Sequence, residues 1–411
     1  MNNPKIHSLS SENKQILRNQ VIDENGPGTV LRDFEILLGF IGSKRCQVSS
    51  KNNLLPMDLL SQLNAQLTHP IEIGLSRPLQ KSYPYINGLY LLLRTTRLAY
   101  IEVAKTEQVL VLNEPVLQEW QKLNSTERYF TLLETWLLKV NPEVLGEHST
   151  SLDIPIFKWS SFFKEIPAQG LKVVGNKDKE EFINYIIGLY TVALLELFGC
   201  ISVQHGKPEK GKGWRMAMVH RTPFGDALLQ LLGNVLNHPK YFYKESEMDV
   251  CFGELQPIIQ PFFPQWRKNL SLPKPEFQDG IYIFKVSLGN VWRLIAIPAE
   301  NDLESLSNII LRTFNFDFDH LYCFTYRNRF GISINVNHPD MKEEPLLADE
   351  VIIGDLDIKP GTIMTYLYDF GDNWEFDVKL ERIDPVDPKI KSPIILESHG
   401  RPPQQYPIWN E

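Results

Sequence analysis

The sequence is poor in cysteine, and the few cysteines that it has are far apart. Four occur in 411 residues, and no two of them form a C-x-x-C pair. Neither a disulfide framework nor a zinc site built from thiolates is therefore indicated, and a reducing cytoplasm is the expected compartment. The four are Cys46, Cys200, Cys251 and Cys323.

Targeting, membrane and common catalytic patterns are also missing. The N-terminus MNNPKIHSLS has no basic region followed by an apolar core, so no secretory signal is expected. The most apolar stretch, 182–203, contains Glu196 and several polar residues and glycines, which favours a soluble helix and strand over a membrane span. There is no G-x-x-x-x-G-K-S/T phosphate loop, and no Ser/His/Asp or Cys/His order stands out.

Charge is distributed unevenly along the chain. The net charge is −8, but residues 276–411 hold 12 Lys or Arg against 23 Asp or Glu, which gives −11, while residues 1–275 carry +3. Nucleic-acid affinity depends on neutralising phosphates, so any such contact is expected in the first two thirds of the chain. The final third would repel DNA.

The length predicts more than one core. Domains of roughly 100 to 200 residues suggest about three in a chain of this size. We predict an α+β multidomain protein with a mainly helical N-terminal part and a β-grasp-like C-terminal domain. The predicted divisions are a mobile arm at 1–30, a winged-helix-like module at 31–145, a packed linker at 146–178, a second such module at 179–256, a proline-rich connector at 257–275 and an α+β domain at 276–411.

The first module is predicted from a helix, hairpin, helix order. A helix is expected at 85–95 and two strands at 99–103 and 109–112. Further helices then begin after Asn113 and after Ser125 or Thr126, which are suitable capping residues. This is the skeleton of a winged helix.

The same order returns 100 residues later. The segment INGLY at 86–90 corresponds to IIGLY at 186–190, and six of eighteen positions are identical across 86–103 and 186–203. We predict a tandem repeat. In the second copy the hairpin loop, HGKPEKGKG at 205–213, is long and basic.

Basic residues of the second module are candidates for phosphate contacts. Such a loop between two strands would act as a wing that grips a nucleic-acid backbone. The alternative is a solvated surface loop. The expected recognition helices, 85–95 and 185–198, are very apolar and offer Arg94 and Arg97 as base-reading donors, which argues against sequence-specific recognition. The candidates are Lys207, Lys210, Lys212, Arg215 and Arg221.

The last domain begins with two alternating strands, 281–288 and 291–298, joined by Gly-Asn, a strong signal for a tight hairpin. Asn301 and Glu304 form a possible capping box for a helix with one apolar face. Strands at 321–326 and 332–336 follow, and a final hairpin closes the domain. This order predicts a ubiquitin-like β-grasp.

The closing hairpin, 362–383, has the densest pattern in the chain. Its two arms alternate apolar and polar residues, so one side should be buried and the other exposed. We expect Tyr368 and Trp374 to point inward, the carboxylates to point outward, and Gly371 to take a positive φ in the turn.

Several stretches of the last domain resemble one known family. VWRLIAIPA at 291–299, FDFDHLYCFTY at 316–326, the run at 353–383 and HGRPPQQYP at 399–407 are similar to the plasmid pRiA4b ORF-3-like family. The resemblance implies a compact α+β domain without an assigned activity, often met on plasmids and other mobile elements. Many members close with a cysteine-bearing segment, whereas this chain has GRPPQQY there, which supplies no thiolate for a metal.

The mouth of the closing hairpin is a candidate cation site. Asp369, Asp372 and His320, with Glu375 nearby, form an oxygen-rich set suited to Mg²⁺ or Mn²⁺, which could cleave phosphodiesters. The alternative is structural: Asp372 and Asn373 stabilise the turn and Asp369 accepts backbone amides.

Three functions remain open at this point. The first is a non-enzymatic binding or adaptor protein with a DNA or protein partner, no membrane contact and no required cofactor. The second is a metal-dependent phosphodiester hydrolase with catalytic Asp369, Asp372 and His320, for which a divalent cation is needed. The third is a structural adaptor whose two modules pack on each other.

Overall fold

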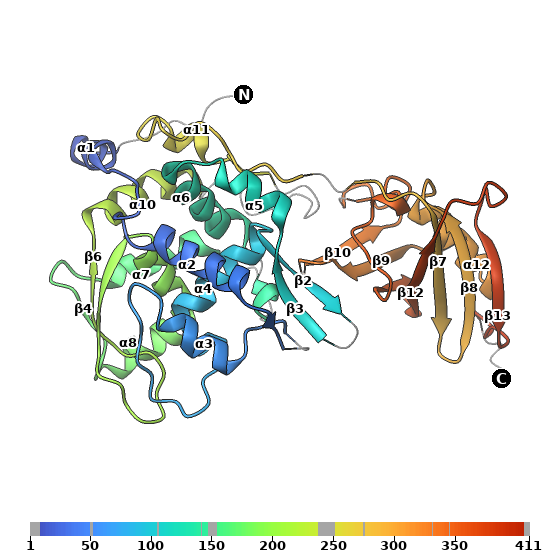
Figure 1. Cartoon of the computed structure of the whole chain (residues 1–411), viewed down its shortest axis with the longest axis horizontal. Coiled ribbons are helices and arrows are strands. Elements are labelled where there is room, and N and C mark those ends of the chain that lie inside the picture. The colour runs from blue at the N-terminus through green and yellow to red at the C-terminus, as the bar shows by residue number, and fades with distance from the viewer. Residues whose placement is uncertain are drawn as a thin grey trace. The chain divides into compact units, whose positions relative to one another are not determined.

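The chain forms two compact units of mixed α+β structure, as predicted for the fold class. This computed structural model describes residues 9–49, 52–104, 107–140, 142–146, 154–236, 251–273, 276–330, 332–344 and 346–406. The first unit contains the described residues up to Pro273, and the second contains those from 276 onward. Figure 1 shows the first unit as mainly helical and the second as mainly strands.

From α2 onward, the first half of unit 1 has the order helix, strand, helix, helix, hairpin, helix, helix. The strands form a three-stranded antiparallel sheet of order β1-β3-β2. The elements are α1 Ser11–Asn19, α2 Val30–Ser43, β1 Cys46–Gln47, α3 Met57–Asn64, α4 Pro84–Thr95, β2 Ala99–Ala104, β3 Glu107–Leu112, α5 Glu114–Gln121 and α6 Ser125–Glu134, with a π-helical turn at Thr135–Lys139.

The second half repeats this order with the same strand arrangement. Its sheet has the order β4-β6-β5 and is also antiparallel. The elements are α7 Pro155–Glu165, β4 Leu171–Lys172, α8 Lys177–Glu181, a π-helical turn at Phe182–Ile187, α9 Leu189–Leu197, β5 Ile201–His205, β6 Met216–Arg221, α10 Pro223–Leu236 and α11 Gln256–Ile259.

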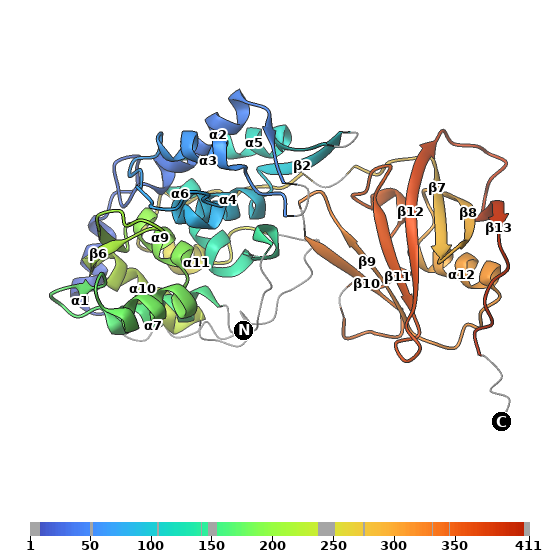
Figure 2. The ribbon, with the colours of Figure 1, turned by 90° about the horizontal axis from the view of Figure 1, so that it is seen from below.

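Helices α4 and α9 pack against each other inside unit 1 (Figure 2). Every residue of α4 is buried. Gly88 allows the close approach, because a Cβ there would lie 2.9 Å from Cγ of Leu194. The two halves of the unit therefore share one core.

The predicted helix at 185–198 is interrupted. A π-helical turn ends at Gly188, whose φ of 86° breaks the helical backbone, and α9 begins at the next residue. Glycine adopts this conformation without the penalty that a side chain brings. Tyr185, within the π-helical turn, is 81% exposed.

Two segments predicted to lie outside the modules pack on unit 1. Residues 11–19 of the predicted mobile arm form α1, which packs on α10 with Leu17 completely buried. In the predicted connector 257–275, the rings of Phe263 and Trp266 lie 4.8 and 5.1 Å from Phe130 of α6. The mobile-arm prediction was wrong for residues 11–19, because one large apolar side chain outweighs the polar residues around it, whereas the connector has no long regular element, as its prolines predict.

Unit 2 is built on a seven-stranded sheet with the order β10-β9-β11-β12-β7-β8-β13, antiparallel at every pairing. The elements are β7 Ile281–Leu288, β8 Val291–Pro298, α12 Leu303–Phe314, β9 Tyr322–Arg327, β10 Ser333–Asn337, β11 Ile363–Tyr368, β12 Trp374–Asp384 and β13 Ile394–His399. Helix α12 packs on one face, where Phe314 contacts Phe376 and Ser307 bonds Tyr366 (Figure 2). The β-grasp topology is not confirmed.

The closing hairpin is β11 and β12, paired from Ile363↔Lys379 to Tyr368↔Trp374. Its inward side chains are completely buried, namely Met364, Tyr366, Tyr368, Phe376, Val378 and Leu380. Trp374 is half-buried, with its ring 5.0 Å from Phe316.

Two details of the hairpin differ from the prediction. Gly371 does not take a positive φ, whereas Asp369 (58°) and Asn373 (55°) do. Asp369 is buried rather than turned outward. Asx side chains can bond their own backbone, which allows them to replace glycine in the left-handed region.

Strand β13 forms one edge of the sheet, and all six of its residues are exposed. Ile394, Ile395 and Leu396 stand next to each other in it.

In the described part of the chain, no helix combines the length and the apolar content needed to cross a bilayer.

Candidate functional site

The basic loop between β5 and β6 is held in place by backbone hydrogen bonds. The amide of Gly74 donates to the carbonyl of Lys212 at 2.9 Å, and the amide of Gly211 donates to the carbonyl of Gly74 at 2.8 Å. Within the loop, the Lys212 amide also bonds the carbonyl of Glu209 at 2.9 Å. The loop is therefore fixed rather than free, because it is paired with a second loop far away in sequence.

The five basic candidates fall into two groups. Lys207, Lys210 and Lys212 are exposed, and their ammonium groups form no ion pair with other described residues. Arg215 and Arg221, in contrast, form ion pairs with acidic residues of the same unit.

Arg215 bridges two acids and Arg221 binds one. Arg215 lies 2.9 Å from Glu180 and 3.3 Å from Glu209, and its side chain is 14% exposed. Burial alone would raise the pKa of Glu180, but the hydrogen bond and charge of Arg215 lower it. Arg221 lies 3.6 Å from Asp226. These two arginines brace the hairpin and are poor candidates for phosphate contacts.

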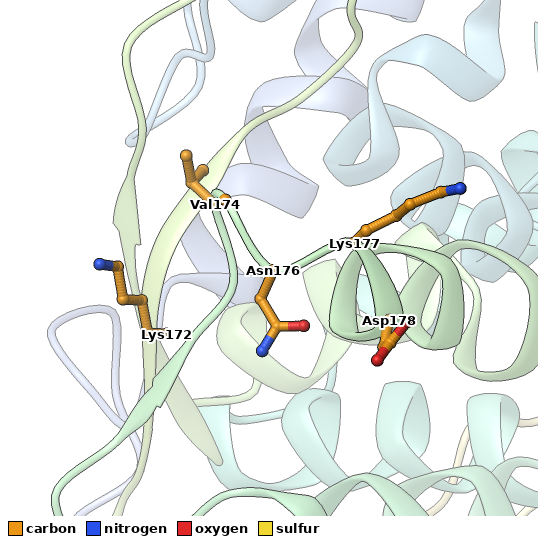
Figure 3. Close-up of a pocket in the computed structure, with 6 residues that line it drawn as sticks. Lys172, Val174, Asn176, Lys177 and Asp178 are labelled. Atoms are coloured by element: carbon orange, nitrogen blue, oxygen red, sulfur yellow. The ribbon is translucent and has the colours of Figure 1, made fainter.

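A polar hollow of about 380 Å³ lies beside β4 and the start of α8. Figure 3 shows the ammonium groups of Lys172 and Lys177 pointing in opposite directions, away from Asn176. Asn176 itself accepts the amide of Lys179 at 3.2 Å and so caps α8. A small ligand would require polar side chains that converge on one point, and the side chains of this hollow do not.

The helices predicted to be recognition helices turn most of their side chains into the protein. Helix α4 is enclosed on all sides, and Arg94, one of the two predicted base-reading donors, is 1% exposed and donates to the Tyr90 hydroxyl at 3.0 Å. In α9 most side chains are buried as well. Apolar recognition helices were predicted to weaken sequence-specific contacts, and their mutual packing gives the physical reason.

At the mouth of the closing hairpin, His320 and Asp369 come together. His320 Nε2 lies 3.5 Å from Oδ2 of Asp369 and 3.5 Å from Oδ1 of Asp319. Oδ1 of Asp369 accepts the amide of Gly371 at 2.9 Å. The structural alternative predicted this bond between Asp369 and the backbone.

Asp372 and Glu375 are exposed and do not complete a cation site. Among the described residues, no group of three or more His, Cys, Asp or Glu side chains is placed to hold a metal ion. The described side chains therefore offer a His320–Asp369 pair at 3.5 Å, without the set of oxygen ligands that the sequence suggested.

Residues 281–405 match the sequence profile of the plasmid pRiA4b ORF-3-like protein family. They form a plasmid pRiA4b ORF-3-like domain. Over 116 residues the chain is 27% identical to the uncharacterized protein y4hQ of Sinorhizobium fredii. The aligned region covers 28% of this chain and 58% of that protein. It is also similar to the crystal structure of MM3350, a protein of unknown function from Methanosarcina mazei Go1, with 26% identity, a TM-score of 0.26, and coverage of 29% of this chain and 70% of that one.

Three separate segments of the ORF-3-like domain meet around His320. The Tyr406 hydroxyl lies 3.0 Å from His320 Nε2 and donates to Asp319 at 3.3 Å. Gln405, which is 5% exposed, accepts the amide of Asp317 at 2.7 Å, and Tyr368 donates to the Asp317 carbonyl at 2.7 Å. The C-terminal segment is thereby tied to the loop before β9 and to the end of β11.

This polar cluster was only partly predictable. Partial loss of solvent and the Asp319 carboxylate raise the pKa of Tyr406 to about 12, so its hydroxyl stays protonated and acts as a donor. Burial raises the pKa of Tyr368 in the same way. Gln405 and Tyr406 lie in a segment without apolar periodicity, so these two residues were missed.

Proposed function

We propose that the protein is a non-enzymatic binding protein whose tandem winged-helix-like modules contact a nucleic-acid backbone through the loop of Lys207, Lys210 and Lys212. Two features support the module assignment. Both halves of unit 1 have the order helix, strand, helix, helix, hairpin, and both sheets place the first strand beside the last. In this assignment the hairpin loops are the wings.

The observation that carries the proposal is the state of the three lysines. They are exposed, they have no ion-pair partner among the described residues, and they stand on a loop fixed by its bonds to Gly74. Three lysines without ion-pair partners can bind the phosphates of a nucleic-acid backbone. Because their loop is already fixed, little conformational entropy is lost on binding.

The contact should be independent of sequence. Base edges are normally read by side chains on an exposed helix in the major groove. Here α4 and α9 are used for packing, so phosphate contacts alone remain. The ORF-3-like domain, with its excess of acids, would recruit a different partner and act as the adaptor part.

An electrophoretic mobility titration on two unrelated short DNA duplexes tests the proposal. The full chain should shift both duplexes with similar affinity, and the triple variant Lys207→Glu, Lys210→Glu, Lys212→Glu should lose the shift. A matched control replaces three exposed lysines of the ORF-3-like domain by glutamate and should leave the affinity for DNA unchanged. These are Lys342, Lys389 and Lys391.

Two outcomes would count against the proposal. If the triple variant binds as well as the parent chain, the loop is not the contact. If the parent chain shifts neither duplex, the protein does not bind DNA through this unit at all.

A further inference from the structure

A second hollow, of about 490 Å³, lies in unit 1 where six segments meet. It is bordered by the end of α1, the starts of α2 and α10, the end of α9, β5 and the loop that carries His69. Its size falls within the range of about 300 to 1,000 Å³ that is typical of small-molecule sites. None of the proposed nucleic-acid contacts lines it.

The floor of the hollow is a close contact between two glycines. Gly28 and Gly199 both have positive φ, 66° and 71°, and a Cβ on Gly199 would lie 2.5 Å from the amide nitrogen of Gly28. The amide of Thr29 also donates to the carbonyl of Leu197 at 2.8 Å. The shape of the floor is therefore fixed by backbone contacts and needs no rearrangement to form.

Glu196 is the carboxylate in the wall. One of its oxygens accepts the amide of Val203 at 2.9 Å, and the other accepts the hydroxyl of Tyr85. Burial raises the pKa of Glu196, although these two bonds and the nearby His69 act against the rise. Among the described residues that line the hollow there is no lysine or arginine. The basic side chain in this lining is His69, so Glu196 lacks the lysine or arginine with which a buried carboxylate is normally paired.

The position of His69 is set by a buried acid. Asp33, which is 2% exposed, accepts the amide and the hydroxyl of Thr68 at 2.7 Å each, and the hydroxyl of Thr29 at 2.7 Å. This network holds the loop that carries His69 against the start of α2. The rest of the lining is mainly neutral, with apolar side chains at Ile16, Pro27, Ile201, Pro223 and Phe224.

We propose that this hollow binds a small organic amine whose ammonium group pairs with Glu196 and whose apolar part lies against Ile201 and Phe224. The lining offers one carboxylate and no lysine or arginine, so its charge suits a cation better than an anion. A charge-assisted hydrogen bond to a partly dehydrated carboxylate is stronger than a neutral one. The Ser202 hydroxyl provides a further polar contact at the rim.

Ligand-observed fluorine NMR with the full chain tests this site. The probes are 4-fluorobenzylamine, which carries the ammonium group, and 4-fluorobenzyl alcohol, which has nearly the same shape without the charge. We expect saturable broadening for the amine and a dissociation constant at least about tenfold weaker for the alcohol.

Three variants separate the effect of the Glu196 charge on binding from the effect of the open volume of the hollow. Glu196→Gln removes the charge, and Ser202→Trp fills the hollow from an exposed position on β5 while keeping Glu196. Each should weaken binding of the amine by about tenfold or more. Gln204→Trp is the control, because Gln204 is exposed on the same side of β5 but does not line the hollow, and it should leave binding unchanged.

The proposal is overturned if the amine shows no saturable binding, if amine and alcohol bind equally, or if Ser202→Trp binds like the parent chain. Far-ultraviolet circular dichroism of each variant checks that it is folded. The Ser202→Trp result stands even if Glu196→Gln unfolds. The DNA titration is independent of this test, so the two proposals can fail separately.

Discussion

Glu134 on α6 accepts a 2.7 Å hydrogen bond from the backbone amide of Gly253, more than a hundred residues later in the chain. Its second oxygen accepts the amide of Leu255 at 2.9 Å. Both amides belong to the segment directly before the predicted proline-rich connector. A single completely buried carboxylate thereby attaches this segment to the core of unit 1.

Replacing that carboxylate should destabilise unit 1. In Glu134→Gln one side-chain oxygen becomes an NH₂ group, which faces a backbone N–H and leaves it without an acceptor. We expect a loss of about 1 to 3 kcal/mol in the free energy of unfolding, measured by urea titration with circular dichroism. Glu254→Gln, which removes only a surface ion pair with Lys139, should cost less than about 1 kcal/mol. Equal losses in the two variants would contradict this role for Glu134.

The glycine contact at the floor of the hollow should not accept a side chain. Gly199→Ala places a methyl group against the backbone of Gly28 and Pro27. Gly175→Ala is the control, since Gly175 also has a positive φ, 82°, but has open space around it. The control should cost about 1 to 2 kcal/mol for the backbone conformation alone, and Gly199→Ala should cost clearly more in thermal unfolding. If the two variants lose the same stability, the close approach of Gly28 and Gly199 does not limit the side chain at position 199.

The stability that Glu196 contributes should fall as pH rises. Its pKa in the folded state is raised by burial above the unfolded value of about 4.3. The folded state therefore binds the proton more tightly, and this contribution is complete below the unfolded pKa and is lost as pH increases through the folded pKa. The difference in unfolding free energy between the parent chain and Glu196→Gln should decrease over this interval and then level off. A difference that is constant with pH would show that the pKa is not raised.

Fixing the basic loop should matter for nucleic-acid affinity independently of its charge. Gly74→Ala would place Cβ 1.8 Å from the carbonyl oxygen of Glu209, so the two loops must separate. We expect an affinity for DNA about three- to tenfold weaker, measured by electrophoretic titration. Gly39→Ala, at a position with open space in α2, is the control and should bind normally. Unchanged affinity in Gly74→Ala would mean that a loose loop binds as well as a fixed one.

Arg293 should stabilise β13 against local unfolding. Its guanidinium group, 5% exposed, donates to the carbonyls of Trp292 at 2.8 Å, His399 at 3.0 Å and Thr313 at 3.3 Å. A lysine cannot reproduce this planar set of bonds. In Arg293→Lys we expect amide hydrogen exchange in β13 to become about tenfold faster, as for a local loss of about 1.4 kcal/mol.

Two comparisons define that experiment. Exchange in β9 of the same variant should stay close to that of the parent chain. Arg312→Lys, at an exposed position in the last turn of α12, should change neither strand. Slow exchange of β13 in Arg293→Lys would show that pairing with β8 is sufficient to hold it.

Sequence patterns predicted the elements that are long or bounded by strong turns. The Gly289-Asn290 pair gives the expected hairpin, with Leu288 directly opposite Val291. The alternating arms of β11 and β12 also pair as expected. In these cases the local pattern and the tertiary structure favour the same conformation, so the pattern alone is sufficient.

The failures have identifiable physical causes. Strands β1 and β4 have two residues each, too few to show a period of two. Asn301 was expected to cap α12, but the adjacent Asp302 does so by accepting the Ser305 amide at 2.7 Å. Helix α4 is buried on every side, and an apolar periodicity cannot show which partner covers each face. Tyr406 joins His320 across 86 residues of sequence, which no local pattern could reveal.

The packing of α4 on α9 through Gly88 has a consequence for the handling of unit 1 as separate pieces. Each of these helices covers part of the apolar surface of the other. Either half of unit 1 expressed alone would therefore expose that surface to water and tend to aggregate.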